Sequence, residues 1–94
     1  MDFAWDTAKA EEENIRKHGV DFAAAARIFL DPYRLEREDI RFPYGEPRFA
    51  VIGMVGVQVL VLIYTPRADR IRIISARKAD RRERRAYATG KTAS

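Results

Sequence analysis

The spacing of hydrophobic residues in the first third of the chain predicts a short strand followed by two helices. Residues 3–5, Phe-Ala-Trp, alternate like a short strand, and Asp6 is a suitable N-cap for a helix over about residues 7–18 that ends at a glycine. Asp21 can cap a second helix over residues 22–30, whose apolar residues recur every three or four positions until a proline ends it. The second helix therefore has one apolar face to bury.

From residue 33 onward the alternation typical of β-strands dominates. Residues 33–40 alternate weakly and predict an edge strand, and residues 42–47, with two prolines and a glycine, predict a loop. Three segments rich in β-branched residues follow at 49–54, 57–65 and 70–75. Their short connections make them antiparallel neighbours. The middle segment is apolar on both faces, so we expect it to be the central strand, covered by a helix on at least one side.

A final helix is predicted by the spacing of Asp80 and Glu83, which is that of a capping box. This helix ends near Gly90, and residues 91–94 are expected to form a frayed tail. The predicted order of elements is β-α-α-β-β-β-β-α in a single domain over residues 1–94. The fold class is therefore α+β, with helices packed on an antiparallel β-sheet of about four strands.

The composition narrows the classes of function. With 94 residues, 47% of them hydrophobic and 34% charged, the chain is expected to fold as one domain. It has no cysteine and a single histidine, His18, so we expect no disulfide, no metal site and no cofactor. The longest apolar stretch is interrupted and too short to span a membrane, and the acidic N-terminus lacks the features of a secretory signal. These features predict a cytoplasmic protein that does not contact a membrane.

The charge of the chain is divided unevenly. Residues 1–65 hold eight basic and eleven acidic residues, a net of −3, whereas residues 66–94 hold ten basic and three acidic residues, a net of +7. A concentrated basic segment attracts polyanions, which makes nucleic acid the first partner to consider and an acidic protein the second. The alternative interpretation is a solvated charged surface with no partner.

Two sequence patterns, one near each end of the chain, carry a family resemblance. The C-terminal pattern RIRIISARKA…E…Y is present as residues 70–79, Glu83 and Tyr87, and the stretches RF.VIG and VLIYT precede it at 48–53 and 61–65. The N-terminal pattern WD…K…N..KHGV.F is present as Trp5, Asp6, Lys9, Asn14, Lys17, His18, Gly19, Val20 and Phe22. Together these residues resemble the BrnT family of toxins over nearly the whole chain.

The resemblance implies a fold, an activity and a set of partners. It implies a RelE-like toxin of a type II toxin-antitoxin system, which cleaves RNA by attack of the 2′-hydroxyl without a metal and so inhibits translation. It also implies a BrnA-like ribbon-helix-helix antitoxin that neutralises the toxin in a dimer of heterodimers. Operator DNA would then be bound only through the antitoxin.

Two arginines near the last predicted strand are candidates for clamping phosphate. RNA carries its own nucleophile, so the protein must remove a proton, stabilise the charge on phosphorus and protonate the leaving oxygen. Arg72 and Arg77 suit the second task, because a guanidinium stays charged and binds phosphate through two donors. Strict alternation places them on opposite faces, so they act together only if the strand ends or twists before Arg77. The alternative is that each pairs with a surface acid such as Glu36, Glu38 or Asp39.

The final helix offers a second group of candidate catalytic residues. Glu83 and Tyr87 are four residues apart and share a helix face, with Arg84 adjacent, so they could supply a base, an acid or a stacking surface. The alternative roles are structural, because Glu83 completes the capping box and Tyr87 can dock the helix on the sheet.

The basic residues outside the last strand supply the remaining candidates. Histidine is the side chain type whose ordinary pKa lies near neutrality, so His18 is a candidate proton shuttle, although a cation at the end of a helix also has a structural explanation. The four arginines of the last helix are distributed around most of its circumference, so they cannot all contact one site; they are Arg81, Arg82, Arg84 and Arg85. The predicted RNA-binding residues are Lys17, Lys78, Arg81, Arg84 and Arg85.

Two functions of different classes therefore remain open. The first is a metal-independent endoribonuclease with Arg72, Arg77, Glu83, His18 and Tyr87 as candidate catalytic residues. The second is a non-catalytic basic module that acts as a co-repressor with a DNA-binding partner. A third interpretation is a small stable domain whose charge run has no function.

Overall fold

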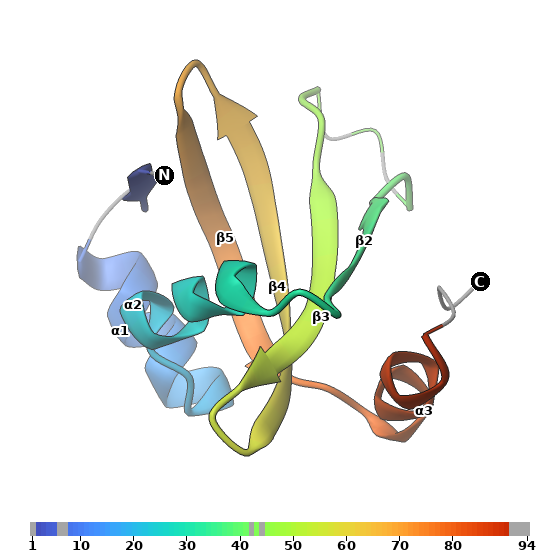
Figure 1. Cartoon of the computed structure of the whole chain (residues 1–94). Coiled ribbons are helices and arrows are strands. Elements are labelled where there is room, and N and C mark those ends of the chain that lie inside the picture. The colour runs from blue at the N-terminus through green and yellow to red at the C-terminus, as the bar shows by residue number, and fades with distance from the viewer. Residues whose placement is uncertain (1, 6–7, 42, 44, 91–94) are drawn as a thin grey trace.

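In a computed structural model, residues 2–5, 8–41, 43 and 45–90 are described, and they form helices on both sides of one sheet (Figure 1). The predicted cap Asp6, the predicted tail 91–94 and parts of the predicted loop 42–47 lie outside the described residues. The elements in chain order are β1 (Asp2–Ala4), α1 (Ala8–His18), α2 (Phe22–Ala25), the 3₁₀-helix η1 (Ala26–Leu30), β2 (Leu35–Glu38), β3 (Phe49–Val55), β4 (Gln58–Arg67), β5 (Arg70–Lys78) and α3 (Arg81–Thr89).

The sheet has five strands among the described residues, in the spatial order β1-β5-β4-β3-β2. β2 to β5 form the predicted antiparallel meander, with β4 at its centre and β2 at one edge. The predicted order of elements is therefore confirmed. β1 adds a fifth strand that runs parallel to β5, with Asp2 opposite Arg70, so the sheet is mixed rather than purely antiparallel. This pairing joins the N-terminal strand to residues about 70 positions later in the chain. The alternation of residues within a strand does not indicate which distant strand it pairs with.

Two layers of helix cover the sheet, and Figure 1 shows α1 and α2 grouped together and α3 apart from them. Phe22 and Ile28 pack with Leu62 in the larger core cluster, on the side of α1 and α2. Ala79 and Tyr87 pack with Val61 in a smaller cluster on the side of α3. Because alternate residues of a strand point to opposite faces, these two clusters lie on opposite faces of β4.

The second predicted helix is α-helical only over its first turn. The side chain of Asp21 caps it as expected, by accepting a hydrogen bond from Ala24 N at 3.1 Å. Beyond Ala25 the backbone tightens into a 3₁₀-helix that ends with a bond from Asp31 N to Ile28 O at 3.1 Å. The tight turn buries Ile28 against Gly53, where an added Cβ would lie 2.6 Å from Ile28 Cγ1. Close approach to the sheet therefore explains both the 3₁₀ geometry and the glycine.

β5 is longer than predicted and contains a β-bulge. It continues to Lys78, and its register with β4 shifts between Ile63 and Tyr64, so that Ile74 has no opposite residue. The extra residue interrupts the alternation of side chains. Arg72, opposite Thr65, and Arg77, opposite Val61, consequently project from the same face of the sheet, which is the face that α3 covers.

The buried Asn14 side chain joins α1 to the edge of β5. β1 covers only Arg70 to Arg72 of that edge, and farther along the amide of Asn14 takes the place of a neighbouring strand. It donates to Ala76 O at 2.9 Å and accepts from Ala76 N at 3.2 Å. It also donates to Val20 O at 2.8 Å. One side chain thus satisfies three buried backbone groups.

Candidate functional site

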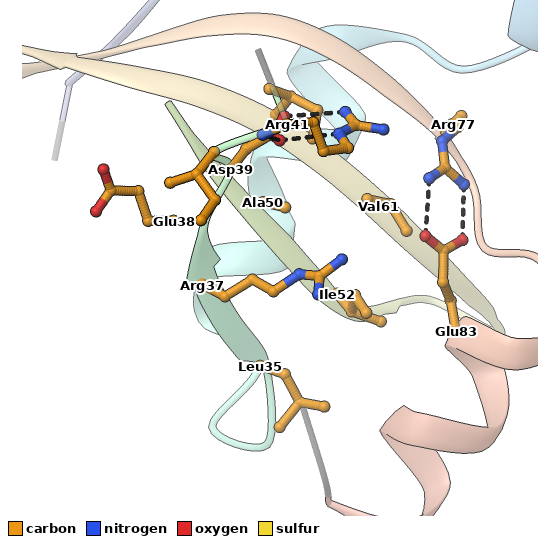
Figure 2. Close-up of a pocket in the computed structure, with 12 residues that line it drawn as sticks. Leu35, Arg37, Glu38, Asp39, Arg41, Ala50, Ile52, Val61, Arg77 and Glu83 are labelled. Atoms are coloured by element: carbon orange, nitrogen blue, oxygen red, sulfur yellow. Dashed lines mark hydrogen bonds and ion pairs between the residues drawn. The ribbon is translucent and has the colours of Figure 1, made fainter. Parts of the chain in front are cut away.

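A pocket of about 130 Å³ opens on the α3 face of the sheet, between the start of α3 and the segment that follows β2 (Figure 2). Its floor is apolar and is made by side chains of β2, β3 and β4, namely Leu35, Ala50, Ile52, Val61 and Ile63. Its rim is charged and includes Arg37, Asp39, Arg41, Arg77 and Glu83. The pocket therefore combines an apolar surface with guanidinium and carboxylate groups.

Arg77 and Glu83 form one side of the rim. Two parallel hydrogen bonds join them, from Nη1 to Oε1 at 2.7 Å and from Nη2 to Oε2 at 2.8 Å (Figure 2). Glu83 Oε1 also accepts from Asp80 N at 2.9 Å, and Asp80 Oδ1 accepts from Glu83 N, which confirms the predicted capping box. The carboxylate therefore holds both the end of β5 and the start of α3.

Both members of this pair are charged at neutral pH. The hydrogen bonds from Arg77 lower the pKa of Glu83 below its ordinary value, although burial acts in the opposite direction. The bond to Glu83 raises the pKa of Arg77, and the positive charge of Arg41 opposes this rise. Arg41 is therefore near enough to Arg77 for their charges to interact.

Arg41 and Asp39 form the opposite side of the rim. Asp39 accepts from Arg41 Nε at 2.8 Å and from Nη2 at 2.9 Å, and its backbone N donates to Arg48 O at 2.7 Å. The side chain of Asp39 is only 4% exposed, whereas that of Arg41 is 64% exposed. A buried carboxylate thus fixes a guanidinium that reaches the surface.

Arg72 lies farther along β5 and interacts with a different acid. Its Nη1 is 3.3 Å from Glu46 Oε2, and the same carboxylate lies 3.4 Å from Arg67 and 3.6 Å from Arg48. Among the residues that the structure describes, three arginines thus lie beside this one carboxylate. Five residues of strand place Arg72 and Arg77 roughly 15 Å apart along β5. They share a face, and in the described part of the chain they form ion pairs with different carboxylates.

Arg72 and Arg77 form ion pairs with acids other than those named in the prediction. Glu36, Glu38 and Asp39 were expected from their place on or after the edge strand, but the ion pairs are made with Glu46 and Glu83. Pairing was expected along the sheet surface. The partners come instead from the segment before β3 and from α3, which the tertiary fold brings over the strand.

Tyr87 docks α3 on the rest of the protein. Its hydroxyl donates to Asp31 Oδ2 at 2.6 Å, and the Asp31 carboxylate also accepts from the backbone N of Met54 and of Tyr33. The bond to Asp31 is the main reason that the pKa of Tyr87 rises to about 12. Burial raises the pKa of Asp31, but these hydrogen bonds outweigh it and lower the pKa overall. The structural role predicted for Tyr87 is therefore confirmed, and its hydroxyl is directed to Asp31 rather than to the pocket.

The remaining predicted residues are spread over the surface. Lys17 and His18 end α1 and so belong to the helical layer on the other face of the sheet. Lys78 lies opposite Leu60 and projects from that same face. Arg81 and Arg85 are exposed on α3, and Arg84 donates to Ala79 O at 2.8 Å. The structure thus brings Arg77 and Glu83 together but does not bring His18, Lys17 or Lys78 to them.

The far rim of the pocket was not predicted from the sequence. Arg37 lies on β2 and Arg41 follows it, and neither was among the predicted site residues. Asp39 was predicted only as a possible partner of other arginines. The one available signal was an acid two residues before an arginine at the end of an edge strand. Such a pair is too common in sequences to indicate a site.

Among the described residues, no three His, Cys, Asp or Glu side chains are grouped so that they could hold a metal ion. No helix in the described part of the chain is long and apolar enough to cross a membrane.

Comparison with known proteins identifies one family. The family model described as a ribonuclease toxin, BrnT, of type II toxin-antitoxin systems matches residues 5–83. The match includes β2 to β5 and the Arg77–Glu83 pair, and it ends before Tyr87. No curated protein matches the chain.

Proposed function

The chain belongs to the BrnT family of ribonuclease toxins of type II toxin-antitoxin systems, and we propose that it is an endoribonuclease whose RNA substrate binds the α3 face of the sheet. The observation that carries the proposal is the Arg77–Glu83 pair. In a chain of this family, the pair combines a carboxylate and a guanidinium beside a pocket. These groups suit two of the three tasks of cleavage by the 2′-hydroxyl, namely removal of its proton and stabilisation of the charge on phosphorus.

The proposed reaction uses the RNA's own hydroxyl as the nucleophile. The 2′-oxygen bonds to phosphorus as its proton passes to the Glu83 carboxylate, Arg77 stabilises the charge on the phosphoryl oxygens, and the bond to the 5′-oxygen breaks. Tyr87 is hydrogen-bonded to Asp31 and His18 belongs to the other helical layer, so we propose that water protonates the leaving 5′-oxygen. The resulting hydroxide takes the proton from Glu83, which restores both the water and the carboxylate. The products are a 2′,3′-cyclic phosphate and a 5′-hydroxyl, and the proposed reaction needs no metal.

Substrate binding would make Glu83 a stronger base. In the free protein Arg77 lowers the pKa of Glu83, which weakens the carboxylate as a proton acceptor. A phosphate that shares the donors of Arg77 reduces this effect and raises the pKa of Glu83. Proton transfer would thus be coupled to the arrival of the scissile phosphate.

Arg72 would contact a different phosphate. In the described part of the chain, Arg48, Arg67 and Arg72 surround the single carboxylate of Glu46, and Arg72 lies roughly 15 Å along the strand from Arg77. Such a cluster suits the RNA backbone outside the scissile bond. This proposal gives Arg72 a binding role in place of the catalytic role predicted from sequence.

The antitoxin would act by covering the same face. A type II system pairs its toxin with a protein antitoxin, and we propose a ribbon-helix-helix protein that presents acidic or hydrophobic groups to the pocket and its rim. The proposed complex contains two copies of each chain, binds operator DNA through the antitoxin and is cytoplasmic. The free toxin would inhibit translation by cleaving RNA.

Cleavage of a 5′-labelled RNA by the purified chain without its antitoxin, in the presence of a chelator, tests the proposal. Arg77→Gln and Glu83→Gln are compared with Arg16→Gln, whose side chain is 79% exposed on α1. We expect cyclic phosphate ends from the wild type and the control but not from the two site variants. Intact RNA would favour the non-catalytic co-repressor, or a toxin that needs the ribosome, and the same assay with translating ribosomes separates these two.

A further inference from the structure

The pocket beside Arg77 and Glu83 has a composition that does not suit a phosphate group. Its floor is made by hydrocarbon side chains of Ala50, Ile52, Val61 and Ile63. Seating a phosphate there would remove water from a charged group without replacing its hydrogen bonds. The floor therefore suits the flat face of a largely apolar group.

Most of the charge around the pocket is paired. Among the described residues, Arg37, Arg41 and Arg77 lie beside two carboxylates, Asp39 and Glu83, and each carboxylate accepts two hydrogen bonds from one arginine. Glu38 alternates with Arg37 along β2, and its carboxylate points away from the pocket (Figure 2). In the Glu46 cluster, by contrast, three arginines lie beside one carboxylate among the described residues. An anion is drawn to the Glu46 cluster, whereas the pocket offers hydrogen-bond donors and acceptors to a neutral polar group.

Arg41 is held in position as a wall of the pocket. Its Nε and Nη2 both bond to Asp39, whose side chain is almost completely buried (Figure 2). Figure 2 also shows the side chain of Arg37 extending across the floor towards Ile52. A guanidinium whose orientation is fixed in this way can stack on the plane of a base.

We propose that this pocket binds one unstacked nucleobase of the RNA, adjacent to the phosphate at Arg77, and that Arg41, positioned by Asp39, forms its stacking wall. The proposal rests on the proposed function, because it assumes that RNA lies on this face. A pocket of about 130 Å³ is far smaller than the roughly 300–1,000 Å³ typical of drug-sized ligands, so it admits a single ring system. Binding of a base in this pocket would make the position of cleavage depend on the identity of that base.

The test is a titration of the full chain with single nucleosides, followed through the NMR signals of the floor methyl groups. The probes are adenosine, guanosine, cytidine and uridine, with ribose 5-phosphate and inorganic phosphate as ligands that lack a base. We expect at least one nucleoside to shift the methyl signals of Ala50, Ile52 and Val61 saturably, with neither base-free ligand doing so. Arg41→Gln should weaken binding about tenfold, the scale of one lost stacking contact, while Arg16→Gln should not change it.

A second variant fills the pocket without altering its charges. Ala50 lies on the floor, so Ala50→Leu should abolish the nucleoside-induced shifts. The other NMR signals should remain those of the folded protein. The proposal is overturned if no nucleoside shifts the floor methyls, if ribose 5-phosphate shifts them equally, or if Arg41→Gln binds as the wild type does.

Nucleoside binding does not require cleavage, so the two proposals can fail separately. Binding without any RNA cleavage would refute the ribonuclease mechanism and leave the pocket assignment standing. Cleavage without nucleoside binding would refute the pocket assignment and leave the ribonuclease mechanism standing. Where both hold, sequencing of the cut sites should show that Arg41→Gln loses the base preference at one position next to the cut.

Discussion

Arg77 and Glu83 face each other across the junction between β5 and α3, joined by hydrogen bonds of 2.7 and 2.8 Å. The same carboxylate accepts the backbone N–H of Asp80 and so completes the N-terminal cap of α3. The residue proposed as the base is therefore also the residue that fixes the helix to the strand.

Replacement of Glu83 by glutamine separates these two roles. The amide oxygen can still accept from Asp80 N, so the cap and the fold are retained, but the negative charge and the basic oxygen are lost. We expect RNA cleavage to fall by about 100-fold or more with an unchanged circular dichroism spectrum. Glu13→Gln, on the exposed surface of α1, is the matched control. Cleavage by the Glu83→Gln protein within threefold of the wild type would exclude Glu83 as the base.

Arg72 and Arg77 should differ in the kinetic constant that they affect. Arg72→Gln removes a cation from the Glu46 cluster, so we expect a higher KM, a dependence of log Kd on log salt that is shallower by about one, and little change in kcat. Arg77→Gln should instead lower kcat, because it removes stabilisation of the reacting phosphate. Steady-state cleavage at several salt concentrations measures both. A collapse of kcat in Arg72→Gln would place Arg72 at the scissile phosphate.

The Tyr87–Asp31 bond predicts a loss of stability in alkali. The folded protein raises the pKa of Tyr87 from 10 to about 12, so its contribution is complete below pH 10 and disappears as the pH rises towards 12. Tyr87→Phe should lower the free energy of unfolding by about 1 kcal/mol at neutral pH, and its difference from the wild type should vanish over that range.

Urea denaturation at a series of pH values measures this effect. Tyr33→Phe is the control, because the side chain of Tyr33 is exposed. Burial and its bond to Glu36 raise the pKa of Tyr64 to about 12 as well, so part of the alkaline loss should persist in Tyr87→Phe. A constant difference between Tyr87→Phe and wild type up to pH 12 would contradict the assignment.

The Arg77–Glu83 pair predicts the opposite dependence in acid. Arg77 lowers the pKa of Glu83 below 4.5, so the pair contributes fully above that pH, and its contribution is lost as the pH falls through the lower folded value. Arg77→Gln should therefore lower stability at pH 7 and reduce the loss of stability between neutral and acid pH. Urea denaturation of the wild type and Arg77→Gln at neutral and acid pH measures this difference in the free energy of unfolding. An equal loss of stability in acid for the two proteins would contradict the contribution of the Arg77–Glu83 pair.

Asn14 should be essential for stability rather than for cleavage. Asn14→Ala leaves the N–H and C=O of Ala76 and the C=O of Val20 without their side-chain partner in a buried region. We expect a loss of about 2–4 kcal/mol in the free energy of unfolding. The neighbouring exposed variant Glu13→Ala should change it by no more than about 0.5 kcal/mol. Equal stability of these two variants would show that the amide does not hold the edge of β5.

The order and type of most elements were determined by local sequence, whereas the 3₁₀ geometry of η1 and the pairing of β1 were not. The caps at Asp21 and Asp80, the end of α3 at Gly90 and the central place of β4 all follow from residues within a few positions of one another. Capping, turn formation and alternation are interactions between near neighbours in the chain, so a single sequence is enough to predict them.

The site was decided by the tertiary structure. The bulge at Ile74 places Arg72 and Arg77 on one face against the strict alternation that the sequence predicts. The choice of Glu46 and Glu83 as their partners, and of Asp39 and Arg41 as the far rim, depends on which segments the fold brings over that face. Sequence alone therefore selected the residue types. Their pairing required the register of the sheet and the packing of α3, because both join residues that are distant in the chain.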